Sequence, residues 1–341
     1  MGYKIGSFNL RNLGLAAMGN GNSRNLRTIA TIIRDEGFDV VALQEVLSQG
    51  KAFMSEDYAK KSILMELGPD WDFSWADAGS ENDPRHEGFA FVWRKSKLRL
   101  SSTMVNTRYG TVERVFYPRM CKTNQADLFR RPYYGRFTTQ GVLGGPNVEF
   151  RLVCVHTYYG KTDSVADREI RQKELDVLMK EVYPQLSDRR YGEPLDAYTI
   201  LLGDYNAELW TTESRKWQEP LKAIRGGKKP AIIETNGDGI VFSQKYGNRA
   251  IKTVQDQLST LKVKQSDQGE ESFDTSGYSY NYDHFSYDER RFEGVRIRVT
   301  CLRNVINGYC VPVNGDYQTD FEKYYHTVSD HIPIMMEIDI R

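Results

Sequence analysis

Short apolar runs that end in a polar cluster recur from one end of this sequence to the other. In the last cluster, Asp330 and His331 directly precede the strand-like segment Met335 to Ile340. Earlier runs are interrupted by Phe8-Asn9, Gln44-Glu45, His156 and the segment from Gly203 to Asn206. Because strand ends gather along one edge of a sheet, this pattern predicts a polar rim built from distant parts of the chain.

The N-terminal third alternates between strand-like and helix-like segments. Tyr3 to Leu10 has strand character, and Arg24 to Glu36 repeats apolar residues at helical spacing, with Ser23 as the expected cap and Gly37 as the stop. Asp39 to Glu45 is nearly continuous in apolar residues, as in strands covered on both faces. A strand, a helix and a strand in this order predict a layered α/β fold.

The rest of the chain continues this alternation and then loses it. Ser55 to Leu67 and Asp163 to Tyr183 are predicted helices, and Trp71 and Trp75 are assigned to a loop between strands. From about residue 211 to 280 the sequence is turn-rich and polar, with short strands and one brief helix expected near Thr253 to Leu261. Because this region has few apolar residues of its own, we interpret residues 1–341 as a single domain with a loop-rich insertion at about 211–280.

Composition excludes a partner bound through net charge. The 46 basic and 46 acidic residues cancel, so a nucleic-acid or membrane partner would have to bind a local patch. One candidate is the basic, aromatic segment from Arg119 to Arg136, for which an ordinary solvated surface is the alternative. No run approaches the roughly 18 apolar residues of a membrane span. We therefore expect a soluble protein, either intracellular or secreted after removal of a leader.

The cysteines do not suggest a disulfide framework. Cys154 lies in an apolar run and is expected to be a buried thiol. Cys301 and Cys310 flank a short segment that a loop or hairpin could close. A bridge between these two residues and two free thiols are both compatible with the sequence.

The side chains of the predicted rim suit phosphate chemistry around a hard cation. Oxygen ligands such as Glu45 and Asp330 favour Mg²⁺, with Mn²⁺ or Ca²⁺ as alternatives, over zinc. A divalent cation with imidazoles that transfer protons is what metal-assisted hydrolysis of a phosphate ester requires. The full inventory of the rim is Asn9, Glu45, Glu87, His156, Asp204, Asn206, Asp283, Asp330 and His331.

Six short motifs in these segments carry a resemblance to the endonuclease/exonuclease/phosphatase superfamily, and they span the chain in the order of that superfamily. They are Ser-Phe-Asn-Leu at 7–10, Leu-Gln-Glu-Val at 43–46, Val-His at 155–156, Gly-Asp-Tyr-Asn-Ala at 203–207, Tyr-Asp-His at 282–284 and Ser-Asp-His at 329–331. Each motif is short, and the ordered set is specific. The resemblance implies a four-layered α/β sandwich of two packed mixed β-sheets flanked by helices.

Within the superfamily, the chain is most similar to the deoxyribonuclease I branch. Glu87 opens an aromatic strand, and Arg130 precedes Pro132 and Phe137, as in that branch. The chain departs from it at Leu47, where the branch has an arginine, and at Leu209, where it has a cysteine.

The resemblance also implies a role for each site residue. The implied metal ligands are Glu45 and Asp330, with Asn9 nearby. The implied acid and base, in either order, are His331 oriented by Asp283 and His156 oriented by Glu87. Asp204 and Asn206 would position the attacking water and the scissile phosphate. The implied substrate-binding residues are Arg130, Asn206 and Arg85, the last standing where the branch has a tyrosine.

Ordinary structural roles compete with these assignments at single positions. His156 is also compatible with a satisfied core imidazole, and Asp204 and Asn206 with simple turn formation. Asp288 competes with Asp283 as the partner of a histidine, and the Tyr-Asp-His sequence favours Asp283. The ordered motifs favour the functional interpretation.

The sequence therefore predicts a monomeric, Mg²⁺-dependent phosphodiesterase, a deoxyribonuclease I-like endonuclease acting on double-stranded DNA. One alternative keeps the chemistry and changes the substrate to RNA, a lipid or a small phosphodiester, in the manner of sphingomyelinases or inositol phosphatases. The sequence lacks the Trp-Cys-Asp-Arg motif of the phosphatases, and no exposed aromatic hairpin for membrane docking is recognised in it. A second alternative is an inactive binding scaffold.

Overall fold

The computed structural model places two large mixed β-sheets at the centre of the molecule. It describes residues 2–14, 24–57, 62–78, 87–122, 128–140, 147–160, 164–191, 195–210, 232–234, 240–242, 249–254, 257–261, 277–309 and 320–340.

The first sheet has six strands, and its only parallel pair lies near its middle. The strand order is β17 (Arg296–Cys301), β18 (Ile334–Asp339), β1 (Gly2–Leu13), β2 (Val40–Leu47), β4 (Glu87–Arg94) and β3 (Trp71–Asp77). Helix α1 (Leu26–Asp35) connects the parallel strands β1 and β2. A 3-10 turn (Gly50–Met54) and helix α2 (Ile63–Leu67) follow β2.

The second sheet has eight strands and repeats this plan. The order is β14 (Ile240–Phe242), β15 (Arg249–Val254), β16 (Asp283–Asp288), β11 (Asp196–Asp204), β10 (Val148–His156), β9 (Tyr133–Thr139) and β5 (Leu98–Leu100), with β8 (Arg119–Met120) also paired to β9. The parallel strands β10 and β11 are connected by α3 (Val165–Val177), a π-helical turn (Leu178–Val182) and α4 (Tyr183–Ser187).

The remaining elements are small. A 3-10 turn (Glu289–Phe292) follows β16, and the helices α6 (Val305–Gly308) and α7 (Asp320–Thr327) precede β18. Two further strand pairs are β6 (Ser102–Thr107) with β7 (Gly110–Val115), and β12 (Glu208–Trp210) with β13 (Ile232–Glu234).

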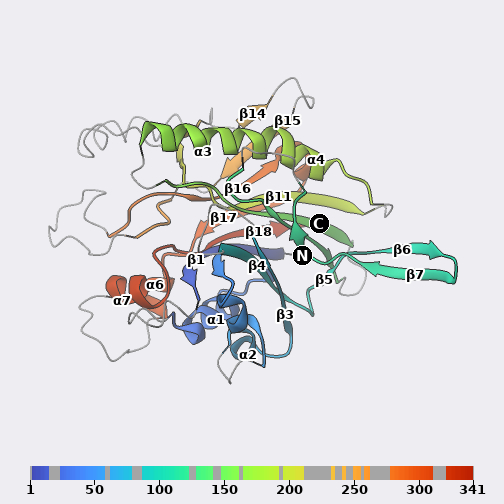
Figure 1. Ribbon diagram of the computed structural model, residues 1–341, viewed down its shortest axis with the longest axis horizontal. Coiled ribbons are helices and arrows are strands. Elements are labelled where there is room, and N and C mark those ends of the chain that lie inside the picture. The colour runs from blue at the N-terminus through green and yellow to red at the C-terminus, as the bar shows by residue number, and fades with distance from the viewer. Residues whose placement is uncertain are drawn as a thin grey trace.

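The two sheets pack face to face, with helices on their outer faces, as Figure 1 shows for α1 and α2 on one side and α3 and α4 on the other. Aromatic rings join the sheets, including Phe91 against Tyr133 with centroids 5.0 Å apart and Tyr3 against Phe150 at 5.3 Å. Under α3, Leu175 and Leu178 pack on Val153 of the second sheet. The four-layered α/β sandwich predicted from the sequence is confirmed.

The first helix shows how local sequence supports this fold. The side chain of Asn25 caps α1 by accepting a hydrogen bond from the backbone N–H of Thr28 at 3.0 Å. Ile29, Ile32 and Ile33 are fully buried on one face, as the spacing predicts. The predicted cap, Ser23, is wrong, because the cap lies two residues later; Ser23 itself lies outside the described residues.

Other local predictions are wrong for similar reasons. A helix is predicted from Ser55 to Leu67, but the described residues 55–57 are not helical and α2 begins only after the capping side chain of Ser62. Trp71 and Trp75 lie in strand β3 and not in a loop, because β3 pairs with β4 along its whole length. The brief helix expected near Thr253 does not form either, since β15 pairs with β16 there. In each strand, pairing with a neighbour outweighs local preference.

The basic segment before and within β9 is also not a simple solvated surface. Tyr133, Tyr134 and Arg136 are buried, and Arg130 is 7% exposed. The hairpin of β6 and β7, in contrast, projects from the body of the molecule (Figure 1), and its Tyr109 is 93% exposed. The protein therefore has an exposed hairpin that carries an aromatic side chain, although no such hairpin was recognised in the sequence.

Three cysteines in the described part of the chain are free, buried thiols: Cys121, Cys154 and Cys301. Cys301 contacts the carbonyl oxygen of Leu258 and is not bridged. Cys310, its possible partner, lies outside the described residues. Among the helices described, none has the length and apolar character needed to cross a membrane.

Candidate active site

A pocket of about 700 Å³ lies where strand ends of both sheets meet. The pairing of β10, β11 and β16 sets its base, because His156 is opposite Asp204 and Asp204 is opposite Asp283. Three side chains from distant segments are thereby fixed in one row. The first sheet contributes Asn9 from β1 and Glu45 from β2.

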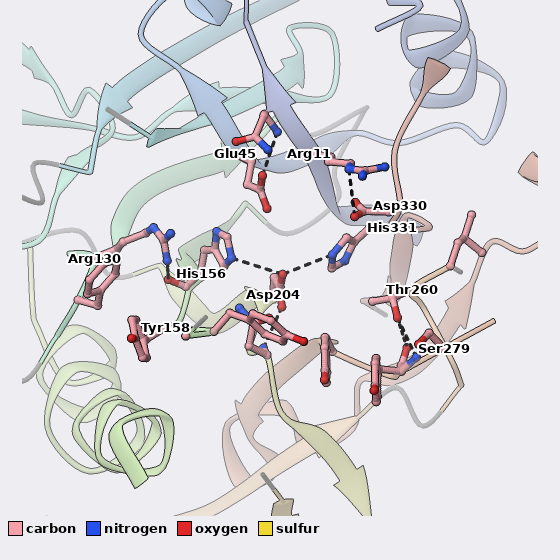
Figure 2. Close-up of a pocket in the computed structure, with 18 residues that line it drawn as sticks. Arg11, Glu45, Arg130, His156, Tyr158, Asp204, Thr260, Ser279, Asp330 and His331 are labelled. Carbon is pink, nitrogen blue, oxygen red and sulfur yellow. Dashed lines mark hydrogen bonds and ion pairs between the residues drawn. The ribbon is translucent and has the colours of Figure 1, made fainter. Parts of the chain in front are cut away.

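Asp204 occupies the centre of the pocket, with an imidazole on each side (Figure 2). Its Oδ2 is 3.5 Å from Nε2 of His156 and 3.6 Å from Nε2 of His331. The same oxygen accepts a hydrogen bond from Nδ2 of Asn9 at 3.1 Å. Both histidines therefore direct the same ring nitrogen toward one carboxylate.

His156 is held from behind by a buried chain of charges. Its Nδ1 bonds Glu87, whose other oxygen accepts a hydrogen bond from Arg130 at 2.7 Å. Burial lowers the pKa of His156, but the carboxylates of Glu87 and Asp204 outweigh burial and raise the pKa above its ordinary value. The imidazole is therefore fixed in orientation and favours its protonated form.

His331 is held in the same way by a different carboxylate. Its Nδ1 is 2.8 Å from Oδ2 of Asp283, which also accepts a hydrogen bond from the hydroxyl of Ser259 at 2.7 Å. Burial lowers the pKa of His331, yet Asp283 and Asp204 raise it well above its ordinary value. Asp288, the sequence competitor of Asp283, lies elsewhere and contacts Arg249.

The turn after β11 orients Asp204. The backbone N–H of Asn206, which has a positive φ of 47°, donates to Oδ1 of Asp204 at 2.8 Å, and its side-chain amide donates to the carbonyl oxygen of Thr157 at 2.9 Å. A Cβ on Gly203 would lie 1.9 Å from the carbonyl oxygen of Val155, so only glycine fits there. These residues form a turn, as one interpretation of the sequence held, and the turn also builds the pocket.

Glu45 reaches the pocket from a bulge in β2. The pairing of β2 with β4 shifts register between Leu43 and Val46, and Glu45 has a φ of 56°. Its carboxylate accepts hydrogen bonds from Nδ2 of Asn9 at 3.1 Å and from the backbone N–H of Asn12 at 2.9 Å. Burial, then the charge of Glu87, raises the pKa of Glu45.

Asp330 lines the same pocket and is paired with Arg11, whose Nε is 3.2 Å away. The guanidinium of Arg11 lies over the ring of Tyr325, 4.0 Å from its centroid. Sequence reasoning assigned no role to Arg11, although it stands two residues after Asn9 in the first motif. It also assigned no role to Tyr280, which lies outside the motifs, or to Tyr282, the first residue of the Tyr-Asp-His motif.

The structure brings nearly all the predicted site residues together. Those that line the pocket or bond a residue that lines it are Asn9, Glu45, Glu87, Arg130, His156, Asp204, Asn206, Asp283, Asp330 and His331. Arg130 donates a hydrogen bond to Glu87 and so supports the carboxylate that holds His156. Arg85 lies outside the described residues.

The donor set fits a hard divalent cation held partly by water. In the described part of the chain, no three His, Cys, Asp or Glu side chains converge as a ready-made metal cage. Mg²⁺ commonly binds one or two carboxylates and keeps several waters. Glu45 suits Mg²⁺, because its half-buried carboxylate lies in the field of two other carboxylates, Glu87 and Asp330, whose charge a cation would offset.

This fold and this pocket of carboxylates and imidazoles define a phosphoesterase of the four-layered α/β type. Residues 6–331 match the model of the Endonuclease/Exonuclease/phosphatase family, and the chain belongs to that family. The family resemblance inferred from the ordered motifs is confirmed.

Solved structures with the same fold are distant in sequence. An endonuclease/exonuclease/phosphatase from Bacteroides vulgatus is 12% identical over 100% of both chains, with a TM-score of 0.51. ANGEL2, a 2′,3′-cyclic phosphatase, is 14% identical over 99% of this chain and 95% of its own, with a TM-score of 0.50. Such similarity concerns the fold alone. No curated protein matches the chain.

Proposed function

We propose that this protein is a divalent-metal-dependent phosphodiesterase that cleaves DNA as an endonuclease. One observation carries the proposal: two imidazoles from distant segments, each backed by its own carboxylate, face the same oxygen of Asp204 at 3.5 and 3.6 Å. Hydrolysis of a phosphodiester needs one group that takes a proton from water and one that gives a proton to the leaving oxygen. His156 and His331 are placed to divide these roles.

The other residues of the pocket would bind and orient the phosphate. Asp204 and the turn at Asn206 would position the attacking water and the phosphate between the imidazoles. The imidazole that acts as the acid carries a positive charge before it gives up its proton, and this charge would attract an anionic ester. Arg130 would hold Glu87 in position through their buried ion pair, and Glu87 in turn orients His156.

The cation would be held by Glu45, with Asp330 and Asn9 nearby. When bound, it would supply positive charge that offsets the charge growing on the phosphate. Mg²⁺ is the ion we propose, since the donors are oxygen atoms. Asn9 donates its amide N–H to Glu45 and so orients this carboxylate.

The test of the chemistry is the nicking of supercoiled plasmid DNA with Mg²⁺. We expect His331→Ala to lower the rate by about 10²- to 10⁴-fold, the range typical of general acid-base groups. His326→Ala is the matched control, because His326 lies on α7 and does not line the pocket. Absence of nicking by the wild-type protein, or full activity of His331→Ala, would contradict the proposal.

The test of the metal site does not depend on activity. Because a ligand that binds only the folded state stabilises it, Mg²⁺ should raise the melting temperature of the wild-type protein. Glu45→Gln should lose this shift, while Glu66→Gln, an acidic residue on α2 paired with Arg27, should keep it. An equal Mg²⁺ shift in the wild type and Glu45→Gln would show that the ion binds elsewhere.

A further inference from the structure

The pocket is lined by four tyrosines that have no part in the proposed proton transfers: Tyr158, Tyr159, Tyr280 and Tyr282. Tyr280 and Tyr282 both line it, and their rings stack in parallel, with centroids 4.7 Å apart and 1° between the planes. Tyr159 lines the same pocket, with its ring 6.3 Å from that of Tyr282. A phosphate group by itself makes no use of such a surface.

The backbone holds this pair of rings in register with the catalytic residues. The carbonyl oxygen of Tyr282 accepts a hydrogen bond from the N–H of Tyr205 at 2.7 Å, and Tyr205 directly follows Asp204. Tyr282 also directly precedes Asp283, the partner of His331.

Tyr280 is fixed on the other side of the pair. Its carbonyl oxygen accepts a hydrogen bond from the N–H of Thr260 at 2.9 Å, and its own N–H donates to the hydroxyl of Thr260 at 2.7 Å. Thr260 is in turn paired with His331 through a β-bridge. The main chain that carries both rings is therefore held in place relative to His331 and Asp204.

The two stacked rings differ in their exposure to solvent. Tyr282 is 7% exposed and lies underneath, while Tyr280 is half-buried at the pocket wall. A flat aromatic surface of this kind binds the face of a nucleobase, and such stacking contributes about 1–3 kcal/mol per base.

We propose that Tyr280, supported by Tyr282, stacks with an unpaired nucleobase of the substrate beside the scissile phosphate. This proposal rests on the proposed function and narrows its substrate. A base that stacks on a protein ring has left the stack of a continuous duplex. The substrate would therefore be single-stranded or locally opened DNA, and not the intact double helix expected from the family resemblance.

The test compares two single-stranded oligonucleotides with the same sugar-phosphate backbone, one with all its bases and one in which every base is absent. For wild-type protein with Mg²⁺, kcat/KM should be roughly 5- to 150-fold higher on the strand with bases. Tyr280→Ala should abolish this preference by lowering kcat/KM on the strand with bases to that on the base-free strand. Tyr280→Phe should preserve the preference, and Tyr109→Ala, on the distant hairpin, is the control.

Several outcomes would overturn the proposal. Equal losses on both strands in Tyr280→Ala would mean that the ring only supports the fold. If a continuous duplex were cleaved as fast as the single strand, stacking of an unpaired base on Tyr280 would not be needed for cleavage.

Failure of the proposed function is distinguishable, because the wild-type protein would then cleave neither strand. In that case, calorimetry with thymidine monophosphate and deoxyribose 5-phosphate still tests the stacking. Tighter binding of the nucleotide that is lost in Tyr280→Ala supports it. Equal binding of the two, or tighter binding of the sugar phosphate, overturns it.

Discussion

The imidazoles of His156 and His331 are held by carboxylates that differ in what else they contact. Glu87 is shared between His156 and the guanidinium of Arg130, and Arg130 also acts to lower the pKa of His156. Asp283 accepts a hydrogen bond from a neutral hydroxyl, that of Ser259. The carboxylates of Glu87 and Asp204 raise the pKa of His156 against burial and Arg130, whereas Asp283, Asp204 and Asp330 raise the pKa of His331 against burial alone.

Replacement of Glu87 by glutamine tests this electrostatic difference. Glu87→Gln keeps the shape and removes the charge that raises the pKa of His156, whereas burial and Arg130 continue to lower it. We expect the limb of the pH–rate profile that His156 governs to move to lower pH, while the limb of His331 stays in place. A lower rate at every pH with both limbs unmoved would mean that Glu87 acts only through the fold.

At the scale of elements, a buried ionic cluster joins the helical layer to the second sheet. Glu149 of β10 bonds Arg136 of β9 and accepts a hydrogen bond from Nε of Arg151 at 2.6 Å. Arg151 also donates to the carbonyl oxygens of Leu186 and Ser187, at 3.0 and 3.1 Å, where α4 ends. The cluster thus fixes the end of the connection between the two strands that carry His156 and Asp204.

Removal of the carboxylate of Glu149 should therefore strongly destabilise the folded protein. Glu149→Ala leaves two guanidinium groups, 3% and 8% exposed, without their common partner, and we expect a loss of about 3–5 kcal/mol in the free energy of unfolding. Urea denaturation would measure it, with Glu113→Ala on the exposed hairpin expected within about 0.5 kcal/mol of wild type. A loss below about 1 kcal/mol would show that water or neighbouring groups compensate both arginines.

Helices and strands differed in how well the sequence predicted them. The isoleucines of α1 define one face at helical spacing, so the helix was predicted and only its cap was misplaced, because both Ser23 and Asn25 are good caps. The end of β15, at Thr253 and Val254, was assigned to a helix because its strand character depends on its pairing with β16. Such pairing involves residues more than thirty positions apart and leaves no local trace.

At the scale of the whole molecule, the sequence predicts one part of the site and does not predict the other. Strand ends are visible in sequence as polar residues after apolar runs, and this was sufficient to propose that His156, Asp204 and His331 converge. The stack of Tyr280 on Tyr282 was not foreseen, since it depends on the bridges of Thr260 to His331 and Leu261 to Tyr278. Sequence patterns thus indicated the reacting groups and missed the surface beside them.

The thiols offer a probe of how the whole sandwich opens. Cys121, Cys154 and Cys301 are buried, and burial raises the pKa of each from 9.0 to about 12. Cys154 also accepts a hydrogen bond from Nε2 of Gln44 at 3.1 Å, a contact between the two sheets. Because only the thiolate reacts, all three should resist alkylation at pH 8 while the protein is folded.

We expect native protein at pH 8 to react rapidly with iodoacetamide at no more than one of its four cysteines, the fourth being Cys310. In urea all four should react, and the three buried thiols should do so at one common rate if the sheets separate cooperatively. The raised pKa values also stabilise the folded state below about pH 9, and this contribution is lost as the pH rises toward 12. Peptide mapping by mass spectrometry identifies each site. Rapid labelling of Cys154 without urea would mean that the sheets part locally beside His156, and that the pocket is not rigidly held by the sandwich.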